Sequence, residues 1–266
     1  MDLVRLLIVA LLYPGLLTAL GLGLLYHLVL RGRLERPTVV RATRESLAQV
    51  GGVVAAVLGL ACLPWPLSPV AMAAWPIAWL AFELAFLLPL LPALISGTPS
   101  LARAAIRAAQ LGLWARTLIW AALAVALMLA ERWSGVALLV HLLALAAALV
   151  ALPAALGWGP FGPETRITLE GLEAGLAQPE RILARLSDDL RGGMLVAAVL
   201  VAGLPGAILP PVLGLGLVVV GVALAAALFR NFAGRIPRMT LSAGLRFCLT
   251  WSAPLVLVAS VALVFV

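Results

Sequence analysis

One carboxylic acid lies in the middle of an apolar segment of the sequence. Glu83 is flanked on both sides by Leu, Ala and Phe within residues 80–86. An ionised group at membrane depth is costly, so Glu83 is either protonated, paired or hydrated in a structural role, or used to move protons or ions. We expect it to meet His141, an arginine or internal water, with a polar neighbour on one of the three following spans. Histidine is the side chain that changes charge most readily near neutral pH, so His141 is the second candidate for an ion path; the alternative is a histidine hydrogen-bonded within the bundle.

A second group of acids is concentrated in one segment. Residues 157–191 hold more than half of the chain's 11 acidic residues. Three of them are assigned to a proton or ion path, with ordinary surface charges as the alternative: Glu164, Glu170 and Glu173. Gln178, Pro179 and Glu180 are typical of a helix start, with Pro in the first turn followed by an acid. Within that helix, the spacing of Arg185 and Asp189 predicts a surface ion pair.

A stripe of polar and aromatic residues precedes the fourth apolar run. Arg103, Arg107, Gln110 and Trp114 are spaced 4, 3 and 4 residues apart, so they share one helix face. This face predicts the rim of a cavity for a head group or a soluble partner, with interface anchoring as the alternative. Arginines near other spans are assigned to partner docking: Arg36, Arg41, Arg44, Arg235 and Arg238. Arg116 and Arg246 are expected to extend to the membrane interface.

The elements that carry these residues follow from composition. The chain has 266 residues, of which 64% are hydrophobic and 11% charged. This excludes a soluble enzyme, a disordered chain and a nucleic-acid-binding domain, and predicts an all-α integral membrane protein of a single polytopic domain, 1–266. The apolar runs predict eight spans: 3–30, 50–65, 69–96, 109–130, 134–153, 191–208, 211–229 and 241–265. The third, with prolines at 76, 89 and 92, is long enough to be kinked or tilted.

Charge placement predicts the orientation of these spans. Most of the 18 basic residues, all of them arginine, fall in the loops after the odd-numbered spans, which the positive-inside rule places in the cytoplasm. The protein is therefore expected in the cytoplasmic (inner) membrane, with both termini on the side that faces away from the cytoplasm. Apolar residues at helical spacing within 38–50 predict an amphipathic interfacial helix in a cytoplasmic segment, 31–49, with a solvated linker as the alternative. The acidic cytoplasmic loop is expected to cover 154–191.

Four stretches of the chain carry a resemblance to known proteins: 12–15 (LYPG), 100–110 (SLARAAIRAAQ), 160–164 (PFGPE) with 169–173 (LEGLE), and 235–238 (RIPR). Together they resemble the NADH dehydrogenase subunit 1 family of respiratory complex I and the related membrane anchor subunits of energy-converting and formate-hydrogenlyase-type [NiFe] hydrogenases. The hydrogenase branch fits better than a true complex I subunit, because several carboxylates of the family pattern are replaced here. The resemblance implies a subunit that docks a soluble redox arm beside antiporter-like membrane subunits, with lipids around it.

The leading hypothesis is therefore a non-catalytic anchor and coupling subunit of a membrane oxidoreductase complex. It would contribute to proton or ion coupling or to quinone access. No cofactor is expected to bind the chain directly, although a quinone at the interface with a partner is compatible with the resemblance. Two alternatives stay open: a small transporter or permease with its site near Glu83 and His141, and a structural scaffold without ion translocation.

Overall fold

Helices account for all regular secondary structure in the described part of the chain. The computed structural model describes residues 13–34, 42–66, 74–133, 135–162, 171–173, 176–204, 209–232 and 235–266. The elements are α2 (Leu16–Arg31), α3 (Arg44–Ala61), α4 (Trp75–Leu87), η1 (Leu88–Leu90), α5 (Leu91–Ile95), α6 (Pro99–Met128), α7 (Val136–Ala155), η2 (Gly159–Phe161), η3 (Gly171–Glu173), α8 (Gln178–Gly203), α9 (Pro211–Phe232), α10 (Leu241–Phe247), η4 (Cys248–Ser252) and α11 (Ala253–Leu263). Each of the eight predicted spans overlaps a helical segment, which confirms the predicted fold class.

Six of these segments are long and apolar enough to cross a membrane: Arg44–Ala61, Trp75–Ile95, Pro99–Met128, Val136–Ala155, Pro211–Phe232 and Leu241–Leu263. The apolar helix α2 is shorter. Helix α8 differs because Asp188, Asp189 and Arg191 lie directly before its apolar half. The start of α8 at Gln178, with Pro179 and Glu180 in its first turn, confirms the predicted helix start.

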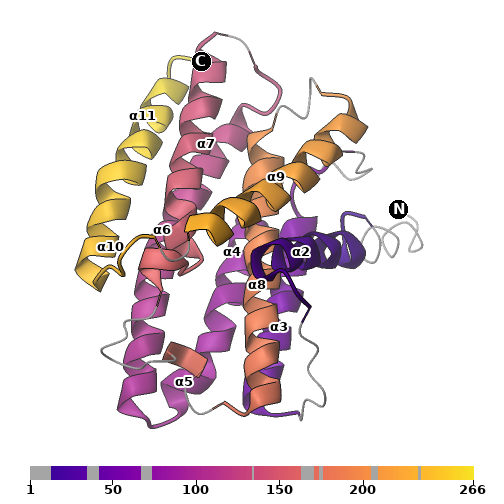
Figure 1. Ribbon diagram of the computed structural model, residues 1–266. Helices are drawn as coiled ribbons and strands as arrows, with labels where there is room; N and C mark the ends of the chain where they lie inside the picture. Colours follow the sequence, from indigo (N-terminus) through magenta and orange to yellow (C-terminus); the bar gives the residue numbers. More distant parts are fainter. Residues whose placement is uncertain are drawn as a thin grey trace.

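The helices are not all parallel to one another (Figure 1). Helices α6, α7 and α11 pack together on one side, and α3, α4 and α8 run alongside them. Helices α2 and α9 lie next to each other and cross α8 obliquely, with α8 between them and the rest of the bundle. Helix α8 is consequently the most enclosed element, and nearly every residue from Asp189 to Gly203 is buried.

The crossing of α2 and α8 depends on two glycines. A Cβ atom on Gly193 would lie 2.7 Å from Cβ of Tyr26 and 3.0 Å from Cα of Gly23. A Cβ on Gly23 would in turn lie 2.8 Å from the Leu190 side chain. Small residues at such a contact let two backbones approach closely, so dispersion contacts replace the hydrophobic driving force that lipid does not supply.

The second span begins earlier than the sequence predicted. Thr43 and Ser46 form a capping box: Thr43 Oγ1 accepts from the Ser46 amide at 3.2 Å, and Ser46 Oγ accepts from the Thr43 amide at 2.9 Å. These bonds satisfy amides that have no partner within the helix and fix its start at Arg44. Residues 44–50 therefore belong to one continuous helix, α3, and the expected separate interfacial helix over 38–50 is wrong for this part. Residues 38–41 lie outside the described residues.

The third span is interrupted as predicted, and the fourth is longer than predicted. Around Pro89 the chain changes from α4 to the 3₁₀ turn η1 and then to α5, because proline has no N–H and crowds the preceding turn. Helix α6 begins at Pro99 and has 30 residues. Arg103 and Arg107, which lie before the predicted start of this span at 109, are therefore part of its first turns.

Candidate functional site

Glu83 forms a buried ion pair with an arginine. Nε and Nη2 of Arg116 on α6 donate to Glu83 Oε2 on α4, at 3.0 and 2.9 Å. Glu83 is 8% exposed and Arg116 is 2% exposed. The polar neighbour expected for Glu83 is thus confirmed as an arginine. The expectation that Arg116 extends to the interface is wrong, because its helix begins at Pro99 and carries it to mid-span.

The space for Arg116 is built into its own helix. A Cβ on Gly112, one turn earlier, would lie 2.6 Å from Arg116 Nη1. On the other side, the guanidinium lies over the ring of Phe86, 4.7 Å from its centroid. Glycine and an aromatic face therefore leave a slot in which the planar guanidinium meets the carboxylate, and the ring adds a cation–π attraction.

A second buried arginine, Arg191 on α8, also holds α4. Its Nη1 donates to the Ala85 carbonyl at 3.0 Å, and its Nη2 donates to Gln49 Oε1 at 3.1 Å. In an uninterrupted helix the Ala85 carbonyl would accept from residue 89, which is a proline without an N–H. Arg191 supplies the missing donor. Gly52 permits this approach, since a Cβ there would lie 2.6 Å from Arg191 Nη1.

Arg191 also connects this contact to an accessible acid. Its Nη2 is bonded to Oδ1 of Asp188, one turn earlier on α8. The Asp188 side chain is 64% exposed, whereas that of Arg191 is 2% exposed. The pair therefore joins a group that water can reach to one enclosed between helices.

Both buried arginines reach the wall of one cavity. It has a volume of about 540 Å³ and lies between α3, the α4 to α5 segment, α6 and the first turns of α8. Asp188 faces it, and so do three further acids from different elements: Glu45, Glu173 and Glu180. Arg116 Nη1 has no hydrogen-bond partner among the described residues, and Glu83 Oε1 is buried without one. The wall can thus donate to an acceptor in the cavity, and its carboxylates can exchange protons with water there.

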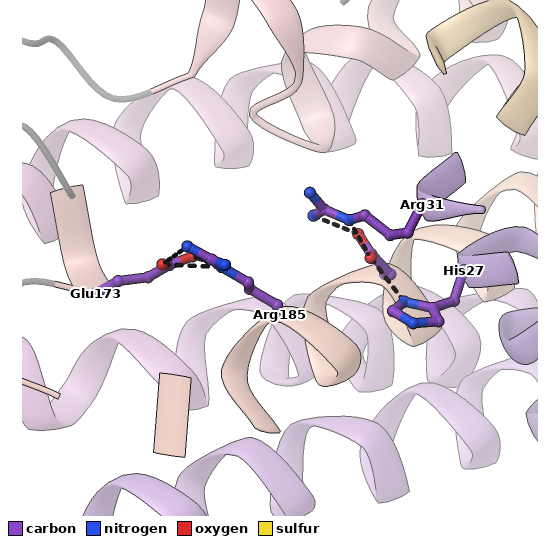
Figure 2. A network of polar contacts seen from close by, with 5 residues as sticks. His27, Arg31, Glu173 and Arg185 are labelled. Atoms are coloured by element: carbon purple, nitrogen blue, oxygen red, sulfur yellow. Dashed lines mark hydrogen bonds and ion pairs between the residues drawn. The ribbon is translucent and has the colours of Figure 1, made fainter. Parts of the chain in front are cut away.

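A second polar network joins α2 to α8 (Figure 2). Asp189 accepts from His27 Nδ1 at 2.9 Å and from Arg31 Nε at 2.8 Å on one oxygen, and from Arg31 Nη2 at 3.1 Å on the other. Asp189 and His27 are both buried. The sequence indicated no special role for His27, so it did not anticipate this network.

The predicted pair of Arg185 and Asp189 does not form. Asp189 is turned toward α2, and Arg185 instead binds both oxygens of Glu173 at 2.6 to 2.9 Å, on the left in Figure 2. The local attraction at four-residue spacing is only a few tenths of a kcal/mol, so tertiary contacts decide which partner each residue takes. Glu173, one of the predicted path residues, therefore lies at the cavity and is paired with Arg185.

His141 lies far from Glu83. Its Nε2 is 3.1 Å from the Leu129 carbonyl and 3.2 Å from the Arg132 carbonyl, and its ring stacks on Trp133 with centroids 3.7 Å apart. Leu129 is 13 residues beyond Arg116, or about 20 Å along a helix. The structure thus does not bring these two predicted path residues together. Glu164 and Glu170 lie outside the described residues, as do Arg36 and Arg41.

The predicted stripe on α6 divides between two environments. Arg107 is 7% exposed and borders the cavity, and its Nη2 donates to the carbonyls of Gly162 at 3.2 Å and Met239 at 2.8 Å. It thereby ties the turn after α7 to the segment before α10. Arg103, Gln110 and Trp114 are exposed and do not line the cavity. The other described docking candidates are exposed as well: Arg44, Arg235 and Arg238.

No protein family with a described sequence pattern matches the chain, and no curated protein matches it. Its fold is similar to that of a chain in the membrane-bound sulfane sulfur reductase (MBS), an archaeal respiratory membrane complex. The similarity has a TM-score of 0.66 at 15% sequence identity and covers 97% of this chain and 98% of that chain. Together with the apolar helices, this shows that the protein is a membrane protein with the fold of a chain from such a complex.

Proposed function

We propose that this chain is a membrane subunit of a multi-subunit redox complex, which anchors a soluble electron-transfer arm and takes part in proton or ion coupling. The shared fold with a chain of a respiratory membrane complex supports this, because the likeness extends over nearly the whole of both chains. The resemblance of four sequence stretches to the NADH dehydrogenase subunit 1 family and to the hydrogenase anchor subunits points the same way. Arg44, Arg235 and Arg238 are exposed, and their positive charge would give electrostatic complementarity with an acidic surface of the arm.

The observation that carries the coupling role is the buried pair of Glu83 and Arg116, in which Arg116 lines the cavity. Charges enclosed between apolar helices are costly and are commonly found on ion pathways. Asp188 can exchange protons with water, Arg191 links it to α4, and Glu83 lies two residues from the Ala85 carbonyl that Arg191 holds. We propose that protons move between the cavity and these carboxylates. Arg116 and Arg191 would stabilise the ionised forms.

The cavity also suits a ligand with a hydrogen-bond acceptor. Its volume of about 540 Å³ is within the range of small-molecule sites. Phe86 and Leu111 on its wall offer apolar contacts, and Arg116 Nη1 offers a donor. A quinone head group has a matching combination of ring and carbonyl oxygens, and we propose it as the occupant if the complex uses a mobile quinone.

Isolation of the complex tests the anchor role. A tagged chain extracted in mild detergent should carry soluble redox subunits, detected by native mass spectrometry. A stable chain without partners would contradict the anchor role and favour a self-contained transporter.

A double variant tests the coupling role separately. Glu83→Gln with Arg116→Gln removes both charges and leaves neither unpaired. In proteoliposomes the complex should assemble and transfer electrons, while ion translocation per electron falls. The matched control is Glu131→Gln with Arg132→Gln, which removes one exposed acid and one exposed arginine just beyond the C-terminal end of α6. Unchanged translocation in the first variant would overturn the coupling role and leave the anchor role standing.

A further inference from the structure

The C-terminal ends of α2 and α9 meet and gather positive charge. Gly32 caps the C-terminal end of α2; it has a φ of 72° and donates its amide to the Leu28 carbonyl at 2.8 Å. Arg230, near the end of α9, reaches across this point, and its Nη1 donates to the Val29 carbonyl at 3.3 Å. A Cβ on residue 32 would lie 3.3 Å from that nitrogen, so Gly32 makes room for the guanidinium. In Figure 1 the two helices converge toward this end, and they are in contact.

Two guanidinium groups at this end present donors to the outside. Arg31 uses Nε and Nη2 on Asp189, but its side chain is 47% exposed and its Nη1 has no partner among the described residues. Arg230 is exposed and uses Nη1 on the Val29 carbonyl. Both side chains are already held in place by these bonds. A ligand would therefore meet donors whose conformational freedom has largely been lost.

The surrounding sequence offers little negative charge in compensation. Arg33 adds a further exposed cation. No acid occurs in residues 228–240, and Glu35 is the only acid between Arg31 and Arg44. Asp189 offsets the charge of Arg31, and Arg33 and Arg230 keep this end of the two helices positive, which favours an anionic ligand.

An apolar stripe on α2 ends at the same place. Leu17, Leu24 and Leu28 are 60%, 37% and 44% exposed and lie on one face of the helix. Arg31 lies at the end of this face. Close by, Trp158 stacks on Phe229 with ring centroids 4.6 Å apart, and tryptophan is enriched where membrane meets water. Apolar side chains that lead to fixed arginines match the two parts of a phospholipid.

We propose that Arg31 and Arg230 bind the phosphate group of an anionic phospholipid whose acyl chain lies along Leu24 and Leu28. Guanidinium groups bind phosphate oxygens through paired, charge-assisted hydrogen bonds. Basic clusters beside membrane helices are known to attract anionic head groups. The exposed leucines favour a lipid over an acidic surface of a protein partner, since such a surface would leave the apolar stripe without a counterpart.

Lipid binding to the purified chain tests the proposal without reference to any redox activity. The chain is placed in nanodiscs of phosphatidylcholine or of phosphatidylcholine with phosphatidylglycerol, and lipids retained after detergent release are counted by native mass spectrometry. Phosphatidylglycerol should be retained preferentially, and its binding should weaken as salt is raised. Equal retention of the two lipids would overturn the proposal.

Arg230→Gln provides the matched variant, because it removes one guanidinium without leaving Asp189 unpaired. Removal of one arginine contact should weaken phosphatidylglycerol binding about fivefold. Arg246→Gln removes the same charge on α10 and should leave the binding unchanged. If Arg230→Gln retains the lipid like the wild type, this surface binds no phospholipid and the proposal fails.

Discussion

Asp189 and Glu83 are both buried carboxylates bonded to arginine, yet they differ in how many hydrogen bonds their oxygens accept. Asp189 accepts three hydrogen bonds, and both of its oxygens have partners. Glu83 receives both of its bonds on Oε2, and Oε1 has no partner among the described residues. Asp189 thus has its acceptor capacity occupied on both oxygens, whereas Glu83 retains one for another donor.

The arginines that bind these two carboxylates differ in how much of each side chain water can reach. The side chain of Arg31, opposite Asp189, is 47% exposed, whereas that of Arg116, opposite Glu83, is 3% exposed. If the acid were lost, water could solvate Arg31 but not Arg116. The contact between Arg31 and Asp189 therefore stabilises the packing of α2 on α8. The contact between Arg116 and Glu83 confines a charge beside the cavity, where its protonation state can matter to function.

The largest expected effect follows from breaking the confined pair. Glu83→Ala should lower the free energy of unfolding by about 3–5 kcal/mol, because it leaves the Arg116 charge buried without a partner. Thermal denaturation in detergent measures this loss, with Leu84→Ala as a control, since Leu84 is an exposed neighbour on α4. Combining Glu83→Ala with Arg116→Met should restore most of the stability. If the single variant is no worse than the control, the charge is not confined as described.

Breaking the contact between Arg31 and Asp189 should lower the free energy of unfolding by less. Asp189→Asn keeps the shape of the side chain and one acceptor but removes the charge, and it should cost about 2 kcal/mol. Arg31 limits the loss because it can turn toward water. Glu180→Gln on the same helix is the matched control, expected to change stability by less than about 0.5 kcal/mol. A loss as large as that of Glu83→Ala would mean that the two carboxylates are equivalent.

The helices could be predicted from the sequence because lipid demands long apolar runs with internally bonded backbone. The partner of Glu83 could be predicted only as a class. Arg103 and Arg107 made the first turns of α6 resemble a loop, so the predicted span began at 109 and placed Arg116 near its end. With the helix starting at Pro99, the same arginine lies at mid-span, and its identity as the partner follows.

For the contact between Arg191 and α4, the sequence indicates the acceptor but not the donor. Pro89 cannot donate to the Ala85 carbonyl, so the sequence indicates an acceptor that needs a donor. Which residue supplies it depends on how α8 packs on α4, and no local rule gives that packing. Asp189 shows the same limit from the other side, because spacing along α8 favoured Arg185 while the close crossing at Gly193 brings His27 and Arg31 to it.

The close crossing itself can be tested at Gly193. Gly193→Ala places a methyl group 2.7 Å from the Tyr26 Cβ. Overpacking costs about 1–3 kcal/mol and the gain in helix propensity returns up to about 1 kcal/mol, so a net loss of about 1 kcal/mol is expected. In Gly216→Ala on α9 no atom lies within 4 Å of the added methyl, so stability should hold or rise. Equal results for the two variants would show that α2 and α8 tolerate a wider separation.

The smallest effect on stability is expected at the exposed pair of Glu173 and Arg185. Their side chains are 27% and 44% exposed, so water can solvate either charge when the other is removed. Glu173→Gln should therefore cost less than about 1 kcal/mol, and the difference from wild type should shrink at 1 M salt, where charges are screened over about 3 Å. Thermal denaturation at low and high salt checks both statements. Because Glu173 also borders the cavity, the same variant separates two roles. Reduced ion translocation with unchanged stability would place Glu173 on the ion path with Glu83, whereas unchanged translocation would make it a surface charge that holds the turn at 171–173 against α8.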